Sequence, residues 1–90
     1  MRELWQIDSY IVYINQKEGF EPVHVRVSKR MSDANTTKIW VQSNGGVALS
    51  NNNSRIPSNI LRKISWFIQN NSGAVLSAWG EMFGKCWFVK

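Results

Sequence analysis

The stretch Glu21–Val27 contains the residue types best suited to chemistry in this chain. His24 is the only histidine, and because unperturbed imidazole titrates near pH ~6.5 it suits a general acid or base. Side chains alternate along a strand, so Arg26 shares a face with His24, where its guanidinium would stabilise charge on a phosphate. The pair indicates a metal-independent ribonuclease-type toxin as one reading. A lone strand histidine is more often a hydrogen-bonded structural residue, so no catalytic residue is assigned.

Other catalytic and metal-binding signals are weak in this sequence. Only Glu21, Asp8 and Tyr13 are candidates for a second acid–base group. One histidine with scattered carboxylates does not make a metal site, so neither a metal nor a cofactor is predicted. The chain contains no glycine-rich phosphate loop, nucleophile elbow or Cys-x-x-Cys motif. We therefore favour a non-enzymatic binding domain over an enzyme.

Cations and aromatic rings, with His24, are expected on the outward face of the predicted sheet. Rings stack on unpaired bases while lysine and arginine contact phosphates, which predicts binding of single-stranded nucleic acid. A solvated sheet face, with its tryptophan packed on the C-terminal tail, is the alternative interpretation. Arg55 is a further candidate for the same footprint. The predicted nucleic-acid-binding residues are His24, Arg26, Lys29, Arg30, Lys38 and Trp40.

Five short apolar segments precede position 55 and predict strands. Leu4–Ile7 and Tyr10–Ile14 flank Asp8-Ser9, which is typical of a hairpin turn. The alternating valines of Val23–Val27 predict the next strand, and Lys38–Gln42 alternates in the same way. Val47–Leu49 is the last predicted strand. A polar linker is expected over Ser50-Asn51-Asn52-Asn53-Ser54.

The second half of the chain has helical periodicity. Apolar residues recur at helical spacing from Ile60 to Ile68 and again from Val75 to Phe83, and Gly84 is expected to end the second helix. The apolar tail Lys85–Lys90 is expected to add an edge strand or to dock on the core. It is also the candidate surface for a homodimer or a protein partner. Strands followed by helices predict a single α+β domain over residues 1–90, an antiparallel sheet of about four to five strands with both helices on one face.

Length and composition limit the class of protein. Ninety residues with a net charge of +5 suit one small domain with an acidic partner, such as nucleic acid or an acidic protein. Cys86 is alone, so an internal disulfide is excluded and a reducing, cytoplasmic location is expected. Its thiol is predicted to be a small packed apolar group. No apolar run reaches the roughly 18 residues of a membrane span, and no signal-peptide core is present at the N-terminus.

The order of these motifs resembles a bacterial family, domain of unknown function number 4160. Its members carry an early hairpin, a Glu-Pro-Pro-His-Val-His-Val type motif, an Ala-Lys-Phe-Trp-Leu type strand and a helical segment ending in Ala-Trp-Asn-Glu-Tyr-Phe-Gly. The corresponding segments here are Ile7–Tyr10, Glu21–Val27, Thr37–Val41 and Asn70–Gly84, so the resemblance covers about residues 4 to 84.

Two positions of the motif depart from the family pattern. Arg26 replaces the second histidine and Val23 replaces the second proline, which argues against a role that needs two histidines. The resemblance implies a small bacterial binding or regulatory domain of the kind associated with toxin–antitoxin systems or mobile elements. Its expected partner is a protein or a single-stranded nucleic acid.

Overall fold

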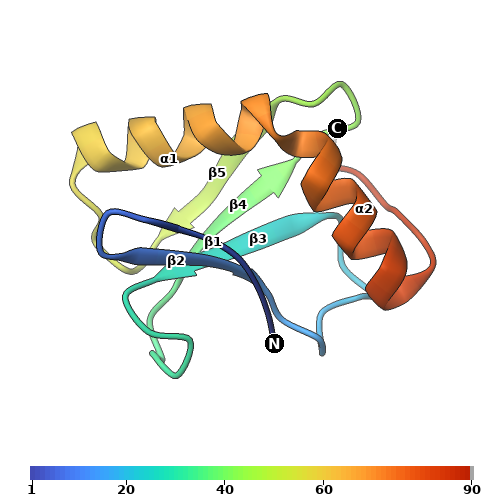
Figure 1. The fold of residues 1–90 in the computed structure, drawn as a ribbon, viewed down its shortest axis with the longest axis horizontal. Helices are drawn as coiled ribbons and strands as arrows, with labels where there is room; N and C mark the ends of the chain where they lie inside the picture. Colours follow the sequence, from blue (N-terminus) through green and yellow to red (C-terminus); the bar gives the residue numbers. More distant parts are fainter. Residues whose placement is uncertain (90) are drawn as a thin grey trace.

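The computed structural model describes residues 1–89 and contains a five-stranded antiparallel sheet followed by two helices (Figure 1). The predicted α+β class is therefore confirmed. The strands lie in the sheet in chain order, each antiparallel to its neighbours. The strands are β1 (Arg2–Ile7), β2 (Tyr10–Ile14), β3 (His24–Ser28), β4 (Thr37–Val41) and β5 (Val47–Asn52).

The register of the sheet sets which side chains share a face. The β1–β2 hairpin turns at Asp8, which adopts the left-handed conformation with φ 54°. Tyr13 of β2 lies opposite Arg26 of β3, and Arg26 lies opposite Lys38 of β4. His24 pairs with Trp40 at the other end of the same β3–β4 ladder. Because alternate residues face one side, the predicted polar face of the sheet is present.

The last strand is longer than its sequence suggests. The polar linker predicted from Ser50 is wrong in its first half, because β5 continues to Asn52 and pairs Asn51 with Lys38. Strand β5 is an edge strand with solvent beside it, so its polar side chains need no apolar partners. Asn52 also accepts a hydrogen bond from the Thr37 hydroxyl at 2.7 Å, which fixes the end of the strand.

Two helices complete the core. Helix α1 (Ser58–Asn70) begins directly after Pro57, and helix α2 (Ser72–Phe83) ends at Gly84, whose φ is 74°. Helix α1 packs along the sheet, whereas α2 lies beyond the N-terminal end of β3 (Figure 1). Nine of the predicted apolar positions are at most 1% exposed, and each contributes about 1.5–3 kcal/mol to folding, whereas the other positions of the helical stripes, such as Ile60 and Leu76, are partly buried. The nine core residues are Val23, Val25, Val27, Ile39, Val41, Ile64, Ile68, Val75 and Trp79.

The tail after α2 docks without forming a strand. The Val23 amide donates a hydrogen bond to the Trp87 carbonyl oxygen at 2.6 Å, and Phe88 packs on the core. Cys86 is exposed, so the prediction that its thiol packs is wrong, because its neighbours dock instead. Lys90 lies outside the described residues. No helix in residues 1–89 is long and apolar enough to cross a bilayer.

Candidate functional site

His24 lies on the predicted face of the sheet but is not open to solvent. Its residue is 1% exposed, because the loop before β3 covers it from one side and α2 reaches it from another. The ring meets Trp40 and Trp79 edge-on, with centroid separations of 5.6 and 5.3 Å. The expectation of an outward-pointing His24 is therefore wrong. A strand pattern gives the face of a side chain but does not reveal a loop that covers it.

Both ring nitrogens of His24 lie within hydrogen-bond distance of an oxygen. Nδ1 is 2.9 Å from the Pro22 carbonyl oxygen, which only accepts, so Nδ1 carries a proton. Nε2 is 3.1 Å from Oε1 of Glu18. An ionised carboxylate also only accepts, so a proton on Nε2 would make both bonds at once in the imidazolium form. The neutral ring instead presents the lone pair of Nε2 to the carboxylates.

Glu18 forms a two-pronged ion pair with Arg26. Nε of Arg26 lies 3.1 Å from Oε1, and an Nη atom lies 2.5 Å from Oε2. Burial raises the pKa of Glu18, but hydrogen bonds from Arg26 and His24 and their charges outweigh it and lower the pKa to about 2. The same hydrogen bond raises the pKa of Arg26. Glu18 is therefore ionised throughout the neutral range.

A second ion pair lies beside the first. Lys38 donates a hydrogen bond to Glu21, and both side chains are mostly buried, at 12% and 23% exposure. The Lys38 ammonium also lies 4.3 Å from the centre of the Trp40 ring, within reach of a cation–π contact. We call Glu18, Glu21, His24, Arg26 and Lys38 the ion-pair cluster. Its two cations are neutralised by two carboxylates from one loop.

The loop between β2 and β3 builds the ion-pair cluster. Turn hydrogen bonds join Glu18 N–H to the Asn15 carbonyl oxygen and Glu21 N–H to the Glu18 carbonyl oxygen, which directs both acidic side chains to the sheet. Gly19 lies against α2, where an added Cβ would approach the Phe83 ring to 2.3 Å. Glu18 was not singled out in the sequence analysis. The available signal was two acidic residues three apart in the chain, just before a strand that carries His24 and Arg26.

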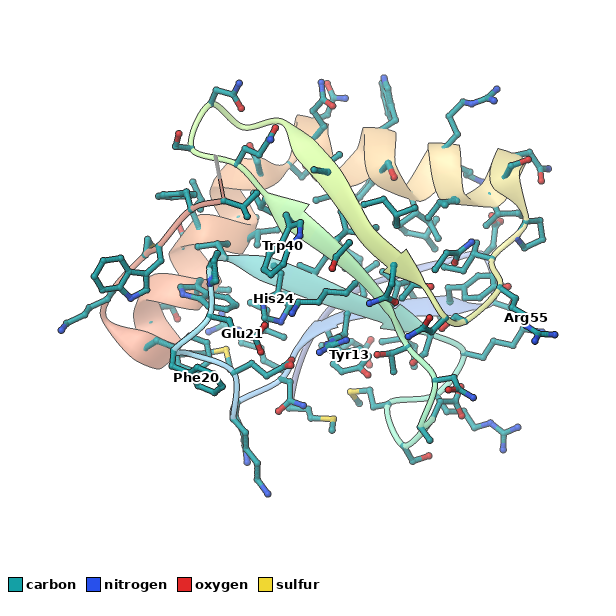
Figure 2. The ribbon with its side chains drawn as sticks, turned by 180° about the vertical axis from the view of Figure 1, so that it is seen from behind. Tyr13, Phe20, Glu21, His24, Trp40 and Arg55 are labelled. Atoms are coloured by element: carbon teal, nitrogen blue, oxygen red, sulfur yellow. The ribbon has the colours of Figure 1, made fainter. Side chains whose placement is uncertain are left out.

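A groove lies at the other end of the sheet. Its volume is about 640 Å³ and it lies between the loop after β3 and the loop after β5. Figure 2 shows Arg55 at this end of the sheet, while His24, Glu21 and Trp40 gather away from it. We call this groove the cation groove, because Lys29 and Arg55 both line it. The other lining residues are Tyr10, Asp33, Ala34, Asn35, Asn52, Asn53 and Ser54.

Side-chain hydrogen bonds hold the walls of the cation groove together. The Ser54 hydroxyl lies 2.9 Å from the Val27 carbonyl oxygen and 3.0 Å from that of Asn35, so it joins the two loops. The Asn52 amide donates to the Ile56 carbonyl oxygen at 2.9 Å and accepts from the Ile56 N–H at 3.1 Å. These two hydrogen bonds, which we call the Asn52 clamp, close a turn that contains Arg55. Arg55 adopts φ 55°, an unusual conformation for a non-glycine residue. Arg55 is thus presented by a rigid turn.

The cations of the groove differ from those of the ion-pair cluster. Within residues 1–89, no carboxylate lies within 4.0 Å of the Lys29 or Arg55 side-chain nitrogens. Lys29 instead lies 5.9 Å from the centre of the Tyr10 ring. Arg30 has a loose pair with Asp33 at 3.9 Å, and its side chain is 81% exposed. One carboxylate, Asp33, also lines the groove, so Lys29 and Arg55 leave positive charge in excess there, open to an anion.

The predicted nucleic-acid-binding residues thus fall into two sets. His24, Arg26 and Lys38 belong to the ion-pair cluster and Trp40 lies beside it, whereas Lys29 and Arg30 lie in the loop beside the groove. Tyr13 faces the same side as the first set but is 2% exposed, so it offers no stacking surface. Arg55, only a further candidate in the sequence, lines the groove together with Lys29.

Comparisons with known proteins found no match for this chain. No protein-family model matches the chain, and neither a curated protein nor a solved structure matches it. The resemblance to domain of unknown function 4160 stays a prediction.

Proposed function

We propose that this protein is a small binding domain for single-stranded nucleic acid, and that the cation groove is its contact surface. The observation that carries this proposal is the excess of unpaired positive charge in the groove, at Lys29 and Arg55. Unpaired cations contact phosphates without first giving up an ion pair, so they contribute more to binding than neutralised ones. The amides of Asn35 and Asn53 would hydrogen-bond base edges or sugars.

The ion-pair cluster is less suited than the groove to contacting phosphates. Arg26 and Lys38 would have to leave Glu18 and Glu21 to reach a phosphate, and the carboxylates left behind would repel the strand. The ribonuclease alternative needs His24 to approach a phosphodiester, yet His24 is 1% exposed and both ring nitrogens face oxygens. The proposal therefore contains no catalytic step.

The cellular setting in this proposal is regulatory, as the family resemblance implies: a bacterial protein of the toxin–antitoxin or mobile-element kind. A protein partner or a homodimer through the tail remains a separate prediction. Trp87, 56% exposed, is its candidate contact.

Binding of a fluorescently labelled oligouridylate, measured by anisotropy at low and rising salt, tests the proposal. We expect the double variant Lys29→Ala/Arg55→Ala to lose about tenfold or more in affinity. The slope of log affinity against log salt should fall by about 1 to 1.5, because each lost phosphate contact removes roughly 0.7.

The matched control is Arg62→Ala/Lys85→Ala, which removes the same charges from exposed sites outside the groove. It should keep most of the affinity. Equal losses for the two double variants would reduce the effect to net charge and reject the groove. Absence of binding at low salt would reject the function itself.

A further inference from the structure

Three potential metal ligands converge in the ion-pair cluster. Glu18, Glu21 and His24 each offer one ligand atom, and these atoms all lie within 4.8 Å of one another. Imidazole nitrogen and carboxylate oxygen are ordinary ligands of Zn²⁺. The carboxylates scattered in the sequence are thus brought next to the only histidine by the loop before β3.

His24 is held in the orientation that a metal ligand needs. Because Nδ1 donates to the Pro22 carbonyl oxygen, Nε2 is left to coordinate, and Nε2 is the atom that faces Glu18. Metal-binding histidines usually donate their other N–H to a carbonyl or carboxylate in this way. The edge contacts with Trp40 and Trp79 restrict rotation of the ring.

The spacing of the ligand atoms also fits. Two ligands bound at about 2.0–2.2 Å to a tetrahedral ion lie roughly 3.3 Å apart. Nε2 of His24 and Oε1 of Glu18 are 3.1 Å apart, so an ion would need little movement of either side chain. Glu18 and Glu21 are 14% and 23% exposed, so the site has access to solvent.

We propose that Glu18, Glu21 and His24 bind a divalent transition-metal ion of the Zn²⁺ type, with a water molecule completing the coordination. Arg26 would stay on Glu18 as an outer partner that orients the carboxylate. Lys38 is different, because its ammonium competes with the metal for Glu21. Removal of Lys38 should therefore strengthen metal binding, whereas removal of the Glu21 charge should weaken it. The proposal does not depend on nucleic-acid binding.

Titration of chelator-treated protein with Zn²⁺ by calorimetry, and with Co²⁺ by visible absorption, tests the site. We expect one ion per chain and Co²⁺ bands typical of a four-coordinate site. Glu21→Gln should weaken Zn²⁺ binding by about 10- to 100-fold, and Lys38→Met should strengthen it. Circular dichroism of each variant confirms that it is folded.

Glu81→Gln is the matched control, because Glu81 of α2 is an exposed carboxylate, at 64%, that pairs with Arg2 of β1. It should bind Zn²⁺ like the original chain. Either of two results would overturn the proposal: no binding at one ion per chain, or equal affinity in the Glu21→Gln and Glu81→Gln variants. Absence of binding would mean that His24 Nε2 and Glu18 are joined only by a hydrogen bond.

Discussion

The ion-pair cluster and the cation groove differ in what surrounds their positive charges. In the cluster, Arg26 and Lys38 are largely buried and each has a carboxylate partner. In the groove, Lys29 and Arg55 line an open volume, and no carboxylate of residues 1–89 pairs with them. Buried charges are expensive unless paired, so the cluster is a structural feature that the loop before β3 makes possible. Unpaired charges at the surface cost little and remain available to a ligand.

Substitution of Glu18 should have the largest effect on stability. Glu18→Gln keeps the shape of the side chain but leaves the mostly buried Arg26 guanidinium without a counter-charge. We expect a loss of about 2–3 kcal/mol in the free energy of unfolding at neutral pH, measured by urea denaturation of chelator-treated protein.

Lys29→Ala is the comparison from the groove, and its effect should stay within about 0.5 kcal/mol, because Lys29 has no ion pair in the described chain. Similar losses from Glu18→Gln and Lys29→Ala would remove the distinction between the two regions.

Acid should destabilise the folded protein by protonating the Glu18 carboxylate. The pKa of Glu18 is about 2 in the folded protein, against an ordinary 4.5 in the unfolded chain. Its contribution is fully present above pH 4.5 and is lost as the pH falls from 4.5 towards 2, since the unfolded state then binds the proton more readily. Unfolding measured across this range should show a fall on the order of 2–3 kcal/mol from this group.

The Glu18→Gln variant should have a flatter stability profile between pH 4.5 and 2, whereas Glu81→Gln should follow the original protein. A steep fall that survives Glu18→Gln would place the acid sensitivity elsewhere.

The parts of the molecule that follow a repeating pattern were predictable from sequence. Valines alternating in β3 and apolar residues at helical spacing in α1 become the core, because burial follows the period of the backbone. The loop carrying Glu18 has no such period, so its fold over the sheet was not predictable. The same holds for Arg55, whose place at the groove depends on the Asn52 clamp. Arg26 and Lys38 were assigned to a binding surface from their type, although only the fold decides whether a cation is already paired.

The most direct test of the account is to locate the nucleic acid on the protein. Backbone and side-chain amide spectra of ¹⁵N-labelled protein, recorded while a short oligouridylate is added, report which residues contact it. We expect the largest shifts at Lys29, Asn35, Asn53 and Arg55, with small shifts at the ion-pair cluster. Largest shifts at His24, Arg26 and Lys38, with an unchanged groove, would contradict the account.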